Sequence, residues 1–235
     1  MKILLVADQE NRKIWDYYEP GLLDPYALIL SAGDLKAHYL SFLATMSRAE
    51  VLYVKGNHDK HYASEEPEGC IPVDDHVYNF YGLRILGLGG SFRYGPGPCM
   101  YTEAEMRKRI RRVKREIKKN GGFDILLTHA PAFGFHDGED LCHRGFQCFR
   151  ELIEEYKPMY FIHGHMHSSY GSGFKRVDRL GETTVINACE KYEIEIPDES
   201  LPLWQNRIKP TSKILRDLRK KHKLSGKEEN HEKNL

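Results

Sequence analysis

Five short polar segments lie far apart in this chain, and each contains side chains that commonly bind metals. They are Asp8 to Glu10, Gly33-Asp34, Gly56-Asn57-His58-Asp59, Thr128-His129 and Gly164-His165-Met166-His167. Most of them follow an apolar, often β-branched run, which is typical of a strand buried on both faces. Because ligands bind beyond the carboxyl ends of strands in open α/β sheets, a fold that aligns these strand ends brings the polar side chains together.

Strand and helix patterns alternate through most of the chain. Apolar runs predict strands at 2–7, 27–31, 51–55, 84–88, 124–128 and 159–163. Helical spacing predicts helices near 35–46, 102–120 and 146–156, and Thr102 with Glu105 forms a capping-box pattern. After residue 167, short runs at 173–177, 183–187 and 192–196 predict antiparallel strands joined by turns, and 77–88 resembles a hairpin.

These elements predict an α/β fold in which two packed sheets are flanked by helices. We expect one domain over residues 1–197, followed by a polar and basic C-terminal extension over residues 198–235. The last residues of this extension are almost wholly polar, which predicts partial disorder. The chain of 235 residues is long enough to bury a sizeable core.

Composition restricts the classes of partner and the compartment. Lys and Arg number 35 against 34 Asp and Glu, a net charge of +1, so bulk charge favours neither nucleic acid nor a membrane surface. No apolar run is long enough to span a bilayer, and no membrane partner is expected. The five cysteines are odd in number and form no Cys-x-x-Cys, which favours reduced thiols and predicts a cytoplasmic protein. The oligomeric state stays open.

The ligand types indicate a class of metal and of reaction. Carboxylate, amide and imidazole groups without a thiolate suit manganese, iron or zinc better than calcium. Two such ions about 3.5–4 Å apart can bind both the attacking and the leaving oxygen of a phosphoryl transfer. Asp34 is central in the ligand order and is the natural bridging carboxylate, while His58, beside a ligand, could donate a proton to the leaving group.

The same segments resemble the motifs of the calcineurin-like metallophosphoesterases, which run Asp-x-His, Gly-Asp, Gly-Asn-His-Asp/Glu, His and Gly-His-x-His. The resemblance covers residues 8 to 167. It implies a four-layer α-β-β-α sandwich of two mixed sheets. It also implies two divalent metal ions, with manganese expected and iron, zinc or nickel as alternatives.

The resemblance further implies hydrolysis of a small phosphomonoester or phosphodiester by metal-bound hydroxide. His58 is then the catalytic acid or a phosphate contact. One metal would be held by Asp8, Asp34 and His167, and the other by Asp34, Asn57, His129 and His165.

The chain departs from the family pattern at two positions. Glu10 stands where the family usually has histidine, so it is either a carboxylate ligand of the first metal or a surface acid. Ala37 stands where phosphatases with Gly-Asp-x-x-Asp have an acid that is thought to orient the catalytic histidine. The orientation of His58 must then come from another part of the chain.

Residues 137–146 resemble a segment of similar small phosphoesterases, which carry an Asp and a His-x-Gly before a helix. His143 and Arg144, near a helix N-terminus, are therefore predicted to contact a phosphate. Asn57 and His58 are the other predicted substrate contacts.

Two other functions stay open. The basic residues of 103–119 are typical of a solvated helix face, but they would also suit a nuclease, so nucleic acid is a less favoured partner than a small phosphoester. A non-catalytic binding scaffold, like the retromer subunit of this fold, is the second alternative, and Glu10 points to it. Several other histidines are interpreted as packed or surface residues: His38, His61, His76, His136, His222 and His231.

Overall fold

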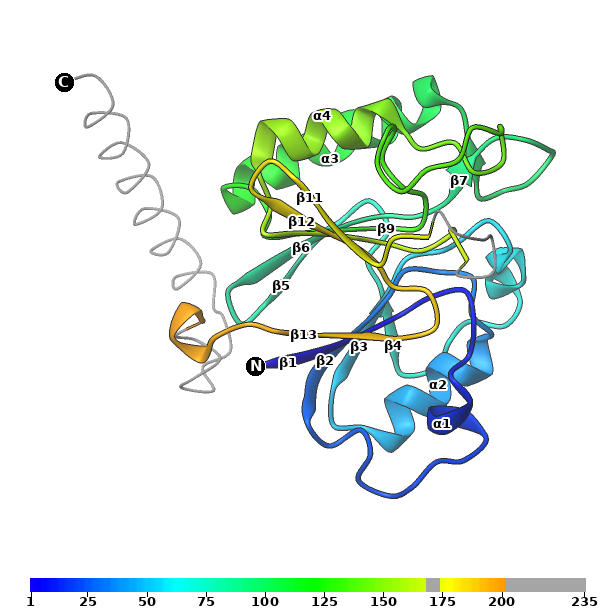
Figure 1. Ribbon diagram of the computed structural model, residues 1–235, viewed down its shortest axis with the longest axis vertical. Helices are drawn as coiled ribbons and strands as arrows, with labels where there is room; N and C mark the ends of the chain where they lie inside the picture. Colours follow the sequence, from blue (N-terminus) through cyan, green and yellow to red (C-terminus); the bar gives the residue numbers. More distant parts are fainter. Residues whose placement is uncertain (168–173, 202–235) are drawn as a thin grey trace.

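Two mixed sheets lie face to face between two layers of helices in the computed structural model (Figure 1). The structure describes residues 1–167 and 174–201. Position 173, where the sequence predicts the start of a strand, and positions 202–235 of the expected extension lie outside the described residues.

The first sheet has five strands in the order β13-β1-β2-β3-β4. β1 to β4 are parallel and β13 runs antiparallel to β1. The strands are β13 (Tyr192–Glu195), β1 (Lys2–Val6), β2 (Tyr26–Ser31), β3 (Glu50–Tyr53) and β4 (Cys70–Pro72).

The second sheet has six strands in the order β11-β12-β10-β9-β6-β5. Its four central strands are parallel, and β11 and β5 pair antiparallel at the two edges. The strands are β11 (Val177–Leu180), β12 (Thr183–Asn187), β10 (Tyr160–His163), β9 (Ile125–Thr128), β6 (Leu83–Leu88) and β5 (Val77–Phe80).

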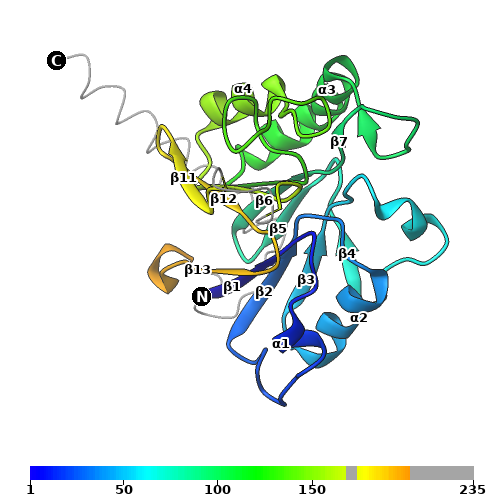
Figure 2. The ribbon, with the colours of Figure 1, turned by 45° about the vertical axis from the view of Figure 1, so that its right-hand side comes forward.

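The helices cover the outer faces of the two sheets. Figure 2 shows α1 and α2 on the first sheet, and α3 and α4 on the second. Short β7 and β8 form a separate parallel pair before α3. The bounds are α1 (Arg12–Trp15), α2 (Ala37–Met46), α3 (Glu103–Asn120), α4 (Gln147–Tyr156), β7 (Ser91–Phe92) and β8 (Met100–Tyr101), and the described 3-10 turns include η1 (Asp59–Ala63) and η3 (Asp198–Ser200).

Three apolar cores separate the four layers. Because successive side chains of a strand point to opposite faces, Ile3 and Leu5 of β1 enter the core between the sheets, while Leu4 and Val6 pack under α1 and α2. Leu126 of β9 packs likewise under α3 and α4. Strands with two buried faces explain the continuous apolar runs in the sequence. The predicted four-layer fold is confirmed.

The best-marked helix of the sequence forms as expected. The Thr102 hydroxyl accepts from the Glu105 backbone N–H at 3.3 Å, and the Glu105 carboxylate accepts from the Thr102 N–H at 2.8 Å, which completes the capping box. Gly121 ends α3 in the left-handed conformation at φ 71°.

The last strands pair differently from the expected antiparallel set. β12 forms a hairpin with β11 but lies parallel to β10, and β13 crosses to the first sheet beside β1. The crossing places Ile194 in the core between the sheets. Across residues 1–167 and 174–201, the fold includes no helix that is both long enough and apolar enough to cross a membrane.

Residues directly after position 197 still pack against the domain. The Met1 ammonium group donates to the Asp198 carboxylate at 2.6 Å, and Leu201 joins the core between the sheets. The division of the chain at residue 197 stays a prediction.

Truncation of one buried valine tests the packing of α3 and α4 on the second sheet. Val185 of β12 is 0% exposed and Val177 of β11 is 44% exposed. We expect Val185→Ala to lower the free energy of unfolding by about 2 kcal/mol, because it removes two buried carbon atoms and leaves a cavity. Val177→Ala should change it by less than about 0.5 kcal/mol. Urea denaturation of both variants measures the difference, and equal losses would contradict the layer assignment.

Candidate metal centre

Five of the predicted ligand segments meet at the carboxyl ends of parallel strands. Asp8 follows β1, Asp34 follows β2, Asn57 follows β3, His129 follows β9 and His165 follows β10. Each loop turns sharply where it leaves its strand. Asp8, Asp34 and His165 turn in the left-handed conformation, at φ 64°, 57° and 68°. This conformation is uncommon for residues other than glycine, and such strain clusters at functional sites.

Gly33 and Gly56 allow two of these loops to approach each other. Gly33 has φ 95°, and a Cβ there would lie 2.5 Å from the Gly56 backbone nitrogen. A Cβ on Gly56 would overlap the Asp34 carboxylate. Any side chain at these positions would therefore separate Asp34 from Asn57.

Three potential ligand atoms surround the His129 Nε2. The His129 Nε2 lies 2.9 Å from Asn57 Oδ1, 3.3 Å from Asp34 Oδ2 and 3.1 Å from His165 Nδ1. An ion about 2.0–2.2 Å from each ligand holds its ligands roughly 3.0–3.4 Å apart, so this spacing fits a transition metal. Asp34, His129 and His165 also form one of the described groups whose ligand atoms lie within 4.8 Å of one another.

Backbone and side-chain partners direct the lone pairs of these groups inward. The His129 Nδ1 donates to the Ala32 carbonyl at 2.8 Å, and the His165 Nε2 donates to the Cys142 carbonyl at 2.7 Å, so the other ring nitrogens are free to accept. The Asn57 amide nitrogen donates to the Tyr94 hydroxyl at 3.0 Å, which leaves its oxygen facing the cluster. When His129 Nε2 carries no proton, these four lone pairs repel one another, and a proton or a metal cation relieves that repulsion.

Electrostatics also favour one positive charge in the cluster. Burial opposes a charge on His129, but the carboxylates of Asp34 and Asp8 outweigh burial and raise the pKa of His129 to about 9. Burial, with His129 nearby, lowers the pKa of His165 to about 3. The cluster thus attracts either a proton on His129 or a metal ion that displaces it.

Asp8 and His167 lie beside this cluster. The Asp8 carboxylate is fully buried and accepts from the His165 backbone N–H at 2.9 and 3.1 Å. Burial raises the pKa of Asp8 to about 7. The His167 Nε2 lies 4.0 Å from Asp8 Oδ1, and its Nδ1 contacts the Gln9 amide at 3.3 Å. The structure therefore brings Asp8 and His167 together next to Asp34 and His165.

The Glu10 carboxylate forms an ion pair with a lysine. The carboxylate lies 3.4 Å from the Lys36 Nζ and is 27% exposed. Within the described part of the chain, Glu10 belongs to neither group of clustered ligand atoms. A ligand role for Glu10 stays a prediction.

His58 lies at the rim of the site. Its backbone N–H donates to the Asp34 carboxylate at 2.8 Å, and its side chain is exposed. Through residues 1–167 and 174–201, no hydrogen-bond partner orients its ring, which agrees with Ala37 in place of an acid. The role of His58 as a proton donor stays a prediction.

The two predicted phosphate contacts, His143 and Arg144, lie in different surroundings. The His143 Nδ1 donates to the Asp140 carboxylate at 2.8 Å, and its ring lies 5.4 Å from the His165 ring, so it borders the centre. The Arg144 guanidinium instead lies over the rings of Phe92 and Phe133, at 5.6 and 5.5 Å. Both roles in phosphate binding stay predictions.

Sequence reasoning missed several residues that support the centre. Asp59, the last residue of Gly-Asn-His-Asp, accepts from the backbone N–H groups of Asp34 and Gly56, each at 2.8 Å, and joins the two loops. Tyr94 holds Asn57. The position of Asp59 in the motif was a signal for its role, whereas no local pattern marks Tyr94.

Comparison with known proteins agrees with this geometry. The calcineurin-like phosphoesterase family matches residues 7–169, and the chain belongs to this family. The family supports a metal-dependent phosphoesterase in general. No curated protein matches the chain.

Solved structures show the same fold. One crystal structure has a TM-score of 0.58 at 14% identity, over 82% of this chain and 94% of that chain. The protein TT1561 of Thermus thermophilus has a TM-score of 0.54 at 15% identity, over 80% of this chain and 89% of that chain. At these identities the likeness concerns the fold alone.

Manganese should stabilise the folded protein. Free Mn²⁺ at about 100 times its Kd adds about 2.7 kcal/mol to the free energy of unfolding, because it binds the folded cluster and not the dispersed segments. The increase should be seen as a higher Tm relative to protein in EDTA. It should be much smaller in His165→Ala and unchanged in His38→Ala, an exposed histidine. A Tm that does not respond to Mn²⁺ would contradict the site.

The ion pair of Glu10 with Lys36 generates a second prediction. We expect Glu10→Gln to leave the Kd for Mn²⁺ within about twofold, because the carboxylate faces Lys36. Loss of a metal ligand or its close support commonly weakens affinity by about 10- to 100-fold. Isothermal titration of Glu10→Gln and His167→Ala with Mn²⁺ separates a ligand role for Glu10 from a surface role. A tenfold loss of Mn²⁺ affinity in Glu10→Gln would establish Glu10 as a ligand.

Proposed function

We propose that the protein is a phosphoesterase with two adjacent divalent metal ions, of which manganese is the expected species. The observation that carries the proposal is the inward convergence of lone pairs from Asp34, Asn57, His129 and His165. A carboxylate, an amide oxygen and two neutral imidazoles form a donor set that suits Mn, Fe or Zn. We assign the first metal position to Asp8, Asp34 and His167, so that Asp34 bridges the two.

When bound, such ions would lower the pKa of a coordinated water and neutralise charge on the phosphoryl oxygens. The residues of this chain supply the geometry. Asp59 and the two glycines hold the Asp34 and Asn57 loops in contact, and the Ala32 and Cys142 carbonyls fix the two imidazoles. Pre-orientation of this kind costs no reorganisation during the reaction.

Two histidines border the centre on the side open to substrate. His58 is exposed and adjacent to Asn57, and His143 is held by Asp140 beside His165. We assign His58 and His143 to contact with the phosphoester, with His58 as the donor of a proton to the leaving oxygen. The substrate can be a phosphomonoester or a phosphodiester.

The two rival functions receive unequal support. A Glu10 carboxylate held by Lys36 would leave the first metal position with fewer ligands than the family pattern, as expected for a non-catalytic scaffold with a degenerate site. Three of the basic residues of α3 pair with acids in other parts of the chain. Arg109 is buried against Asp75, Arg107 pairs with Glu151 and Lys114 with Glu155. These pairs weaken the nuclease hypothesis.

Activity with a simple ester tests the proposal. We expect Mn-loaded protein to hydrolyse a nitrophenyl phosphate mono- or diester, and Asp34→Asn and His165→Ala to reduce kcat/KM by at least about a hundredfold, because each disturbs the metal centre. His38→Ala serves as the matched histidine control and should retain activity. Elemental analysis of the same samples completes the measurement.

The outcomes separate the functions. Two metals per chain with Mn-stimulated turnover support the enzyme. A folded chain that binds no metal after supplementation and does not turn over would instead support the scaffold.

A further inference from the structure

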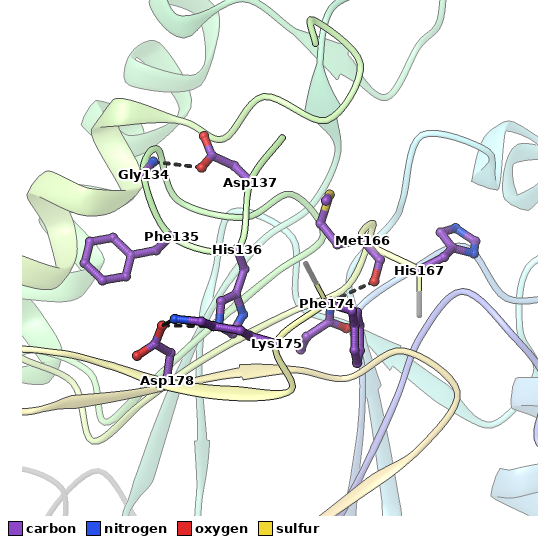
Figure 3. A pocket seen from close by; sticks show the side chains of 10 residues that line it. Gly134, Phe135, His136, Asp137, Met166, His167, Phe174, Lys175 and Asp178 are labelled. Carbon is purple, nitrogen blue, oxygen red and sulfur yellow. Dashed lines mark hydrogen bonds and ion pairs between the residues drawn. The ribbon is translucent and has the colours of Figure 1, made fainter. Parts of the chain in front are cut away.

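A cavity of about 520 Å³ opens beside the metal centre. Figure 3 shows that His167 and Met166 border it on one side, while His136, Lys175 and Asp178 border it on the other, with Phe174 between them. It is large enough for a small organic group. Since His167 lies next to Asp8, a phosphoester at the centre would have its organic part near this cavity.

Most polar groups of the cavity wall already have partners. The Asn187 amide donates to the Met166 carbonyl at 2.7 Å and accepts from the Cys189 N–H at 2.8 Å. The Asp137 carboxylate accepts from the N–H groups of Gly134 and Gly145, at 3.0 and 3.2 Å. These residues shape the wall and have little capacity left for a ligand.

His136 is the exception. Its side chain is only 3% exposed, and its buried Nε2 has no hydrogen-bond partner among the residues that the structure describes. Buried polar atoms are nearly always satisfied, so an orphaned one at a cavity wall indicates a missing partner. The Asp178 Oδ2 lies 3.9 Å away and accepts from the Lys175 Nζ at 3.1 Å.

A chain of hydrogen bonds decides whether His136 Nε2 donates or accepts. The His163 Nδ1 faces the Gly164 carbonyl at 2.9 Å and must donate to it. A second proton on His163 would place an unpaired charge in a fully buried ring stacked on Phe161. The His163 Nε2 is therefore an acceptor, and the His136 Nδ1 donates to it at 3.0 Å. The proton of His136 is thus on Nδ1, and its Nε2 is an acceptor.

We propose that this cavity binds the alcohol part of the phosphoester substrate, and that it selects alcohols with a planar apolar body and a hydrogen-bond donor that reaches His136 Nε2. Phe174 and Met166 supply the apolar surface, while His136 and Asp178 supply two acceptors for one O–H or N–H group. The inference rests on the proposed function and adds the substrate class to it.

Distance along the chain supports the pairing of the two sites. His163 and His165 are two positions apart in the chain, so their Cα atoms lie at most about 7 Å apart. The polar end of the cavity and the metal centre therefore lie within reach of one small substrate. His136 has φ 60°, so the cavity wall is held in a strained turn, as functional sites often are.

A matched substrate pair tests the proposal. Para-(hydroxyethyl)phenyl phosphate and para-ethylphenyl phosphate share an aromatic body and have similar leaving groups, and differ by one hydroxyl group. We expect the unmodified protein to hydrolyse the hydroxyl-bearing ester with a kcat/KM about three- to tenfold higher, the value of one net hydrogen bond. The variant His136→Asn should lose this preference and hydrolyse the two esters with equal kcat/KM.

His136→Asn is designed to preserve the fold. Its amide can still donate to His163, it ends short of the cavity, and asparagine tolerates positive φ better than most residues. His38→Asn is the matched surface control and should keep the preference. Equal kcat/KM for both esters in the unmodified protein would overturn the proposal, because a water would then satisfy His136. A preference that persists in His136→Asn would overturn it as well.

Binding of the free alcohols separates this inference from the proposed function. We expect para-(hydroxyethyl)phenol to bind about three- to tenfold more tightly than para-ethylphenol, with NMR shifts at the amides of Lys175 to Asp178 that vanish in His136→Asn. If neither ester is hydrolysed, the proposed function fails, and this binding comparison alone decides whether the cavity binds the hydroxyl-bearing alcohol. Equal affinities of the two phenols would overturn it.

Discussion

The repulsion between buried lone pairs at the ends of the two sheets governs the rest of this structure. His129 Nε2, His165 Nδ1, Asn57 Oδ1 and Asp34 Oδ2 face one another because the Ala32 and Cys142 carbonyls, the Tyr94 hydroxyl and the His58 N–H occupy their other polar atoms. Such an arrangement is unfavourable unless a positive charge occupies its centre. The fold maintains it with three apolar cores, which fix the strands that the loops leave.

The loops hold the site residues in fixed positions relative to the strands. Asp34, Asp8 and His165 adopt the left-handed conformation directly beyond their strands, and the Asp8 carboxylate receives the His165 N–H. The two sheets are therefore joined at the centre by polar contacts as well as by the apolar core. A site built from strand ends in this way is positioned by the most buried part of the molecule, which suits catalytic geometry.

Local sequence signals predicted most of the strands, the capped helix and the order of the polar segments, because each depends on a few neighbouring residues, but they missed the short β4, β7 and β8. They did not predict that β13 pairs with β1 or that Glu10 faces Lys36, because both depend on contacts between distant parts of the chain. The sequence alone indicates no more than a packed or surface residue at His136. Its role at a cavity becomes visible only through His163, which lies 27 positions away.

Anomalous diffraction from crystals loaded with Mn²⁺ tests the central claim most directly. The account predicts a peak about 2.0–2.2 Å from His129 Nε2, His165 Nδ1, Asn57 Oδ1 and Asp34 Oδ2, with a second peak about 3.5–4 Å away beside Asp8 and His167. The account would be contradicted by a loaded crystal that shows no anomalous peak between these four atoms while the atoms keep the contacts described above.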